Sequence, residues 1–294
     1  MSDLEQTAIE RLKAASDMSL RLFEKPLVIT YSGGKDSDVL LHLAKESGIP
    51  FEVLHSLTTA DAPQTVYHVR DTFHRLEDKG IKCTVDKHVQ PDGSRITMWN
   101  LIPKQGIPNR WSRFCCRFLK ETGGTGRFIA TGVRWDESFA RKKNRGAFEV
   151  VTAKKEDKLI LSNDNSEDRR LFESCQLKGK RVVNPIVDWK TDDVLDYIES
   201  EHICMNPLYG CGFSRVGCIG CPMASKAGRD AEFAMFPKFK AAYIRSFDRM
   251  MEERKRRGKA ENCNWGHDGV DIFHWWMEDG VMPGQEVLDG FEEI

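Results

Sequence analysis

Short apolar runs alternate with helix-like segments over the first half of the chain. Strand-like runs are LVITY (27–31), FEVLHSL (51–57), IKCTVDKHV (81–89) and RFIATGV (127–133). Between them, residues near 36–46, 63–79 and 95–103 repeat apolar positions at helical spacing. This alternation predicts an α/β fold, with a doubly wound, mainly parallel sheet and helices on both faces.

The remaining segments extend this prediction to a two-part chain. The first 25 residues have an amphipathic helical pattern and no features of a signal peptide. Residues 144–183 turn polar, and SNDNSEDRR indicates an exposed loop or hairpin. Thr191 is expected to cap a further helix, DDVLDYIESEH. We expect a nucleotide-binding α/β domain over residues 1–225 and a helical C-terminal extension over 226–294.

The stretch VITYSGGKDSDVLLHL (28–43) places two glycines, a lysine and two serines where a strand gives way to a helix. Glycines allow the backbone N–H groups to approach an anion, and the helix N-terminus carries a partial positive charge. The spacing differs from the GxxxxGK[ST] phosphate loop. The stretch therefore predicts an oligophosphate site; the alternative is a plain turn with a surface lysine. The six residues of this predicted site are Ser32, Gly33, Gly34, Lys35, Asp36 and Ser37.

Composition is that of an ordinary globular protein. The 294 residues are 40% hydrophobic and 30% charged, and no run approaches the roughly 20 apolar residues of a membrane helix. We expect a cytoplasmic protein without a membrane partner. In that compartment the nine cysteines would be reduced, metal-bound or catalytic.

The net charge of −1 hides an uneven distribution. The segment from Lys104 to Arg145, the basic segment, has eleven Lys or Arg against three Asp or Glu. It predicts a surface for a nucleotide, a sulfate-like group or nucleic acid, with Trp111, Phe114 and Trp135 as stacking surfaces. Residues 237–260 have nine basic against three acidic side chains, which a solvated helix face explains.

Two cysteine pairs carry candidate chemistry. Cys115 and Cys116 are adjacent, and Cys218 and Cys221 form a C-x-x-C. Four thiolates suit an iron–sulfur cluster or structural zinc, and adjacent cysteines suit a cluster better because each can bind a different iron. Unliganded or redox-active thiols are the third possibility. Cys211 is a possible extra ligand, and the default interpretation is structural for four others: Cys83, Cys175, Cys204 and Cys263.

Five stretches together resemble the phosphoadenosine phosphosulfate reductase family, within the adenine nucleotide α-hydrolase-like or ATP pyrophosphatase superfamily. SGGKDS is similar to the superfamily's pyrophosphate loop. The others are TTADAPQT (58–65), TGVRWDESFAR (131–141), NPIVDWKTDDVLDYI (184–198) and the cysteine pairs in WSRFCCRFLK and GFSRVGCIGCP. Within the family, the pattern is most similar to iron–sulfur members such as the ATP pyrophosphatases of DNA phosphorothioation.

The resemblance implies adenylation: an acceptor oxygen attacks the α-phosphorus of ATP, pyrophosphate leaves, and a sulfur nucleophile then displaces AMP. It implies ATP (or phosphoadenosine phosphosulfate), Mg²⁺ and a [4Fe–4S] cluster on Cys115, Cys116, Cys218 and Cys221. It also implies an adenine nucleotide as ligand, with nucleic acid and a sulfur-donor or electron-donor protein as candidate partners. The oligomeric state is left open.

Residue roles follow from the same resemblance. The predicted catalytic residues are Lys35, Asp36, Arg134 and Arg141. Lys35 would neutralise the leaving pyrophosphate, and Asp36 would hold Mg²⁺ or orient the loop. Strand-end residues are expected near the adenosine, namely Thr30, Tyr31, Leu57 and Thr58. A second group is expected to close over the phosphates or the acceptor: Gly132, Arg134, Glu137 and Arg141. For the two arginines the alternative is a surface salt bridge.

Two other functions stay open. A phosphosulfate reductase would need a nucleophilic cysteine in an ECG[LI]H-type motif, and the C-terminal region offers only Cys263 in ENCNWGHDG. A regulatory protein would keep the nucleotide and cluster sites without turnover. The C-terminal aromatic patch is expected to serve packing rather than catalysis; it contains Trp265, His267, His274, Trp275 and Trp276.

Overall fold

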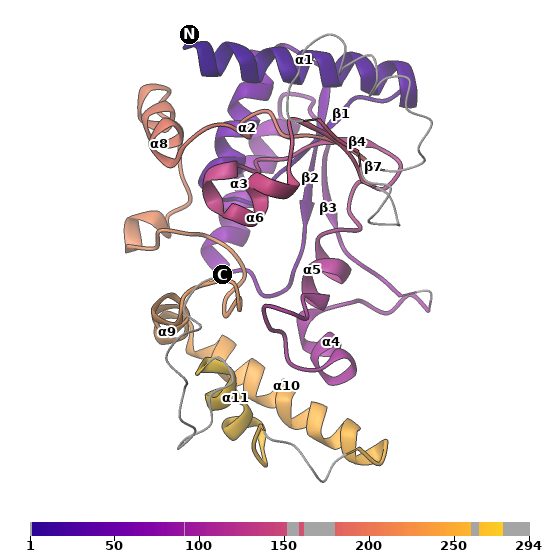
Figure 1. Ribbon diagram of the computed structural model, residues 1–294, viewed down its shortest axis with the longest axis vertical. Coiled ribbons are helices and arrows are strands. Elements are labelled where there is room, and N and C mark those ends of the chain that lie inside the picture. Colours follow the sequence, from indigo (N-terminus) through magenta and orange to yellow (C-terminus); the bar gives the residue numbers. More distant parts are fainter. Residues whose placement is uncertain (1, 91, 152–158, 162–179, 260–264, 279–294) are drawn as a thin grey trace. The chain divides into compact units, whose positions relative to one another are not determined.

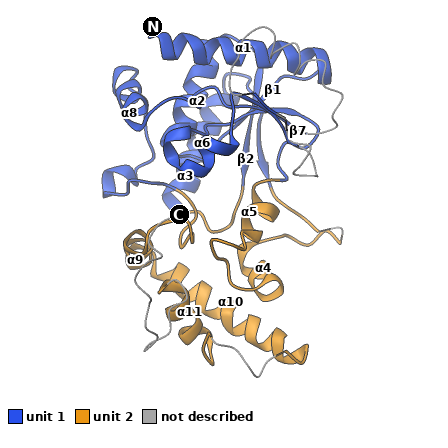
Figure 2. Cartoon of the chain, in the orientation of Figure 1, with its two compact units in different colours: residues 1–56, 63–86, 122–216 blue, residues 57–62, 87–121, 217–294 orange. Residues whose placement is uncertain are grey.

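The computed structural model describes residues 2–90, 92–151, 159–161, 180–259 and 265–278 (Figure 1). The chain divides into two compact units (Figure 2). Unit 1 comprises residues 1–56, 63–86 and 122–216, and unit 2 comprises 57–62, 87–121 and 217–294. This division differs from the boundary expected at residue 225, because segments distant in sequence pack with the C-terminal helices.

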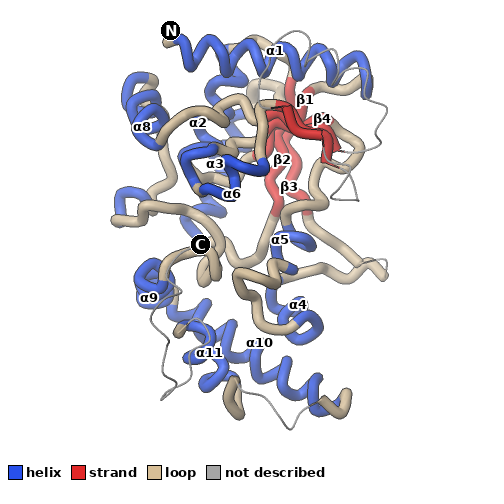
Figure 3. The backbone as a smooth tube through the Cα atoms, in the orientation of Figure 1, coloured by secondary structure: helices blue, strands red, loops and turns tan. Residues whose placement is uncertain are grey.

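Unit 1 contains a seven-stranded sheet in the order β3-β2-β1-β4-β7-β5-β6. Figure 3 draws the strands in red. Its bounds are β1 (Leu27–Thr30), β2 (Phe51–Ser56), β3 (Cys83–Asp86), β4 (Phe128–Ala130), β5 (Phe148–Val151), β6 (Leu159–Leu161) and β7 (Lys180–Val183). The five strands from β3 to β7 are parallel, and β5 pairs antiparallel with both β7 and β6. The expected doubly wound, mainly parallel sheet is confirmed, and the strand order reverses between β1 and β4.

Four helices cover one face of this sheet: α1 (Asp3–Phe23), α2 (Lys35–Glu46), α3 (Pro63–Glu77) and α8 (Thr191–Ser200). Ile29 of β1 packs in one core cluster with α1, α2 and α8, and Val53 of β2 packs with α3. Because Ile29 and Val53 are register partners, they point to the same face. Right-handed crossovers from β1 to β2 and β2 to β3 require this arrangement.

The opposite face holds a smaller cluster built from Val28, Ile129 and Val182. Gly123 and Gly124, which precede β4, lie close to this face. A Cβ on Gly124 would come within 2.7 Å of Ile129, and one on Gly123 within 3.4 Å of Leu54. The residues just before β4 therefore pass close to this face, and the two glycines allow the approach.

The polar region from residue 144 to 183 contains three strands that the pattern did not separate. β5 and β7 are short strands of four residues each. Each contains a buried charged side chain, Glu149 in β5 and Arg181 in β7, which breaks the apolar pattern in the sequence. Glu149 is fully buried and accepts hydrogen bonds from Arg145 Nη1 at 3.0 Å and Asn184 Nδ2 at 2.7 Å. Internal pairing thus permits charged residues in a buried strand. The stretch SNDNSEDRR lies outside the described residues.

Helix α8 begins one residue earlier than the capping prediction requires. Thr191 is its first helical residue rather than its cap. The carboxylate of Asp136 accepts hydrogen bonds from Thr191 N at 2.9 Å and Thr191 Oγ1 at 2.8 Å. A distant side chain therefore caps this helix, which local sequence could not indicate.

Unit 2 is helical and has an aromatic core. Its helices are α4 (Met98–Gln105), α5 (Phe114–Leu119), α9 (Lys226–Met235), α10 (Pro237–Arg256) and α11 (Gly269–Met277). The Tyr243 ring lies 4.9 Å from that of Trp276 and 5.2 Å from that of Trp99. Trp276 is buried, as the packing prediction requires, whereas His267 and His274 are exposed. Over the described residues, no helix is long and apolar enough to cross a membrane.

Candidate phosphate loop and cysteine site

The predicted phosphate loop lies in unit 1 where the strand order reverses. β1 ends at Thr30, and α2 begins at Lys35 with Gly34 as its N-cap. Gly33 has a φ of +75°, and a Cβ there would come within 3.0 Å of Val69. Both the left-handed backbone and the neighbour require glycine at this position.

The loop's own side chains bind several of its N–H groups. Ser37 Oγ accepts hydrogen bonds from Ser32 N and Gly34 N, both at 3.2 Å, and donates to Gly34 O at 2.7 Å. The N–H of Lys35 instead donates to the phenol oxygen of Tyr209 at 3.0 Å. The loop thus has the curled shape of an anion nest, with a hydroxyl in its centre.

Asp36 joins the loop to the segment after β4. Its Oδ1 accepts a hydrogen bond from Arg134 Nε at 2.7 Å, and its Oδ2 lies 3.3 Å from Lys35 Nζ. Arg134 is only 1% exposed, so it is no surface salt bridge. Because cations engage both carboxylate oxygens, the described contacts favour the loop-orienting role of Asp36 over magnesium binding.

The other residues expected beside the loop are held around Arg134. A Cβ on Gly132 would come within 2.9 Å of the Asp36 carbonyl oxygen, so β4 and α2 approach closely here. Glu137 Oε2 accepts from Arg134 N at 3.1 Å and forms an ion pair with Arg141. The structure therefore brings together Gly132, Arg134 and Asp36, with Glu137 and Arg141 adjacent to them.

The side chains of Tyr31 and Thr58 both have partners within the chain, and their expected place near the adenosine stays a prediction. The Tyr31 phenol is buried and donates to Asp38 Oδ1 at 2.6 Å, and burial raises its pKa far above the usual range. Thr58 belongs to unit 2, where its hydroxyl hydrogen-bonds Cys218 Sγ at 3.4 Å. Their side chains thus serve a buried network and the cysteine site.

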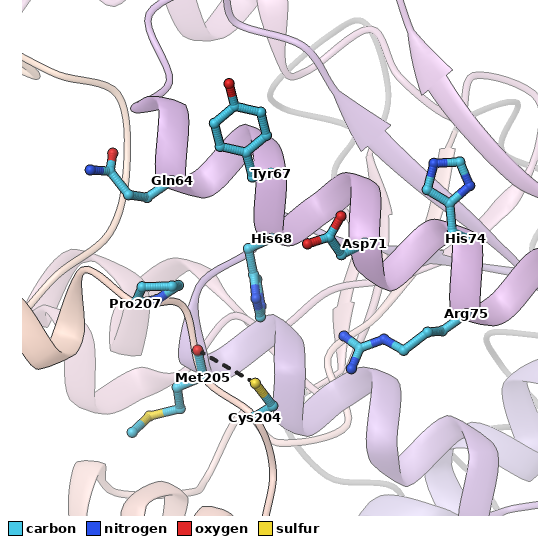
Figure 4. A pocket seen from close by; sticks show the side chains of 9 residues that line it. All are labelled: Gln64, Tyr67, His68, Asp71, His74, Arg75, Cys204, Met205 and Pro207. Atoms are coloured by element: carbon cyan, nitrogen blue, oxygen red, sulfur yellow. Dashed lines mark hydrogen bonds between the residues drawn. The ribbon is translucent and has the colours of Figure 1, made fainter.

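A cavity of about 500 Å³ lies in unit 1 beside α3 (Figure 4). His68 reaches into it from α3 and hydrogen-bonds Asp38 Oδ1 at 3.1 Å through Nε2. Across from the helix, the wall is formed by Cys204, Met205 and Pro207. No residue of the phosphate loop lines this cavity.

Both cysteine pairs lie in unit 2, held by its aromatic core. Tyr243 donates a hydrogen bond to Ile219 O at 2.9 Å, inside the C-x-x-C turn. Glu232 accepts from Gly220 N at 2.6 Å, and a Cβ on Gly220 would meet Phe233 at 2.5 Å. Trp276 Nε1 donates to Pro108 O at 2.6 Å, which fixes the chain leading to the first pair. The C-terminal helices thus support both pairs.

The two pairs lie within electrostatic range of one another. The neighbouring thiols of Cys115 and Cys116 interact, which raises the pKa of Cys115 and lowers that of Cys116. Arg113 Nη2 donates to Cys116 Sγ at 3.4 Å and lowers the Cys116 pKa further. Burial raises the pKa of Cys218. Both Cys218 and Cys221 act on Cys115 through charge.

This donor set bears on the predicted cluster. Within the part of the chain that the structure describes, no group of three or more His, Cys, Asp or Glu side chains converges to hold a metal ion. Cluster ligation by the four cysteines stays a prediction. Cys175 and Cys263 lie outside the described residues.

Sequence reasoning missed Tyr209 and Asn206. Asn206 is 1% exposed and donates through Nδ2 to Gly33 O at 2.9 Å and Thr65 Oγ1 at 3.1 Å. Both residues lie in NPLYG (206–210), 170 residues beyond the loop, without helical or strand periodicity. The Pro, the Gly and the amide side chain indicate a turn, and only tertiary contact links them to the loop.

Comparisons with known proteins place these features in context. A family profile described as "Phosphoadenosine phosphosulfate reductase domain" matches residues 26–224. A protein from Methanocaldococcus jannaschii is 28% identical over 79% of this chain and 48% of its own length. Sulfate adenylyltransferase subunit 2 from Streptomyces lavendulae is 32% identical over 64% of this chain and 57% of its own. The chain thus spans about half the length of these curated relatives.

A solved structure with similarity to this chain is the phosphoadenylyl-sulfate reductase from Candida auris, in a phosphate complex. Its TM-score is 0.45 at 18% identity, with 74% of this chain and 96% of that chain covered.

The close approach of Gly132 to Asp36 gives a stability test. Gly132→Ala should lower the free energy of unfolding by about 1–3 kcal/mol, because its Cβ would meet backbone atoms that cannot move aside freely. Gly210→Ala is the control, since a Cβ there meets nothing within 4 Å. Denaturant unfolding measures both variants. Equal stability of the two would show that β4 and α2 are not in close contact.

Proposed function

Because this chain belongs to the family of the phosphoadenosine phosphosulfate reductase domain, we propose that it is an enzyme that splits ATP into AMP and pyrophosphate. The observation that carries the proposal is the complete SGGKDS loop, curled at the reversal point of the sheet with Lys35 and Arg134 beside it. The name of the adenylyltransferase relative also supports adenylyl transfer.

The residues of the loop would have separate roles in the first step, the adenylation of the acceptor. An acceptor oxygen attacks the α-phosphorus, the bond to the bridging oxygen of the β-phosphate breaks, and pyrophosphate leaves with the electron pair. Backbone N–H groups of residues 33–35 and the Lys35 ammonium would neutralise the leaving group. Arg134 would keep Asp36 and the first turn of α2 in place. A sulfur nucleophile would then displace AMP from the activated acceptor.

The cysteine site supports a second element of the proposal. Cys115, Cys116, Cys218 and Cys221 would hold a [4Fe–4S] cluster, which when bound supplies redox-active iron at a potential set by its surroundings. Arg113, Lys120 and the hydroxyl of Thr58 lie beside these thiols and favour their ionised form. Sulfur chemistry at this site, with a donor protein, would complete the transfer.

The acceptor that we propose is nucleic acid, because helix α6 (Phe139–Asn144) exposes an aromatic ring beside two lysines. Phe139 is 82% exposed, and Lys142 and Lys143 are exposed beside it. Of the predicted stacking residues, Trp111 is 97% exposed. Phe114 is buried, and Trp135 packs on the core and donates to Arg145 O, so these two assignments were wrong. An exposed aromatic ring beside cations suits single-stranded nucleic acid.

The second candidate is a phosphosulfate reductase, which the name of the family profile favours. That reaction would need a cysteine nucleophile, for which Cys263 and Cys211 are the candidates. Products separate the two functions: pyrophosphate and AMP from ATP, or sulfite from the phosphosulfate. Nucleotide binding without either product would indicate the regulatory alternative.

Lys35→Ala tests the phosphate loop. ATP should bind about 2–3 kcal/mol more weakly, roughly 30- to 150-fold in Kd, because a charge-assisted contact is lost. Calorimetry and pyrophosphate release measure the effect, and Lys13→Ala on the exposed side of α1 is the control. Equal ATP affinity in the two variants would show that the loop is a plain turn and does not bind the phosphates of ATP.

Serine substitution tests the cluster. Anaerobically isolated protein should contain iron and sulfide and absorb broadly in the visible range. Serine at Cys115, Cys116, Cys218 or Cys221 should remove that absorbance, whereas Cys204→Ser, at an exposed thiol of unit 1, should not. Stoichiometric zinc without iron would contradict the assignment.

Charge reversal on α6 tests the acceptor. Lys142→Glu with Lys143→Glu should weaken binding of labelled single-stranded nucleic acid and lower its salt slope by about one per lysine. ATP affinity should stay the same, because neither side chain contacts the loop. No binding of DNA or transfer RNA by the unaltered protein at low salt would exclude a nucleic-acid acceptor.

A further inference from the structure

The phenol of Tyr209 occupies a position that a phosphate oxygen would need. Lys35 is the first residue of α2, and the N–H groups of a first helical turn have no partner within the helix. Such groups bind anions. Here the Lys35 N–H donates to Tyr209 Oη at 3.0 Å. The oxygen is also 3.4 Å from where a Cβ on Gly34 would lie.

The phenol is an uncharged partner in an anion site. Burial is the main cause that raises the pKa of Tyr209 to about 12, so the hydroxyl keeps its proton at neutral pH. A neutral oxygen satisfies the N–H group without supplying the charge that the helix N-terminus and Lys35 attract. An anionic oxygen would bind there more strongly than the phenol does.

Tyr209 belongs to a segment of unit 1, residues 206–216, that we call the strap. One end is fixed, because Asn206 is buried and hydrogen-bonds Gly33 O and Thr65 Oγ1. The preceding residues face α3 across the cavity (Figure 4). Beyond Tyr209, Gly210 has open space at its Cβ position, and Gly212 has a φ of +88°. The strap is thus anchored at Asn206, and Tyr209 begins a short helical turn in which Cys211 N and Phe213 N donate to Leu208 O at 3.0 and 3.2 Å.

We propose that Tyr209 is a displaceable competitor of pyrophosphate, which closes the loop in the unliganded protein and moves aside when a phosphate oxygen takes the Lys35 N–H. The inference rests on the proposed function, since it concerns the same site. It makes Tyr209 a specificity-determining residue. Ligands that use the loop must displace the phenol, whereas AMP, which has no β- or γ-phosphate, need not.

The test is Tyr209→Phe, which keeps the ring and removes the oxygen. Inorganic pyrophosphate should bind roughly threefold to tenfold more tightly, because one competing hydrogen bond is gone. AMP affinity should stay unchanged, and so should pyrophosphate affinity in the control Tyr67→Phe, at a 55% exposed tyrosine. Calorimetry on the full chain gives both constants. Equal or weaker pyrophosphate binding by Tyr209→Phe overturns the proposal, and weaker binding would make the phenol a ligand of the phosphate.

Hydrogen exchange at the Lys35 amide provides a readout that needs no ligand. The amide should exchange faster in Tyr209→Phe than in the unaltered protein, because its acceptor is lost. Unchanged exchange overturns the inference, and pyrophosphate binding by the unaltered protein would then leave the proposed function standing. Faster exchange with no pyrophosphate binding in either protein means that the proposed function fails and that the phenol only caps α2.

Discussion

The buried charge of Arg134 is the constraint on which the organisation of unit 1 depends. A guanidinium that is 1% exposed must have its donors satisfied, because an unpaired buried charge is very unfavourable. Arg134 finds its partners on three elements: Asp36 in α2, Asp136 in η1 (Trp135–Glu137), and Thr191 with the Trp189 carbonyl at the start of α8. These contacts fix the loop, the segment after β4 and α8 together.

The same constraint explains the conformation of the loop. Asp36 is held by Arg134 on one oxygen and approached by Lys35 on the other, so the first turn of α2 has a defined orientation before any ligand binds. Gly132 permits the close approach of β4 that this requires. A preorganised set of N–H donors is the arrangement that electrostatic stabilisation of a leaving pyrophosphate needs. Tyr209 then controls when one of these donors becomes free.

In unit 2 the main structural requirement is support for the C-x-x-C turn. A C-x-x-C turn needs a left-handed glycine and rigid support, and Gly220 supplies a φ of +68°. Phe233, Tyr243 and Trp276 pack around this glycine, so the C-terminal helices act as a scaffold for the second cysteine pair. The basic character of α10 is then that of a solvated helix, and its apolar residues, such as Tyr243 and Phe247, serve the core.

The sequence by itself determined the strands and helices whose signal is local. β1 is a continuous apolar run, α2 follows a glycine turn, and their junction identifies the loop because strand, glycines and helix N-terminus are consecutive. Tertiary structure decided what depends on distant partners. β5 contains the buried charge of Glu149, which is paired with Arg145 and Asn184, and β7 contains the buried Arg181, so no periodicity marked these strands. Tyr31 donates to the buried Asp38, and Thr58 hydrogen-bonds Cys218, which lies 160 positions further along the chain. Tyr209 reaches Lys35 across 174 positions, and a contact of that range has no signal in local composition.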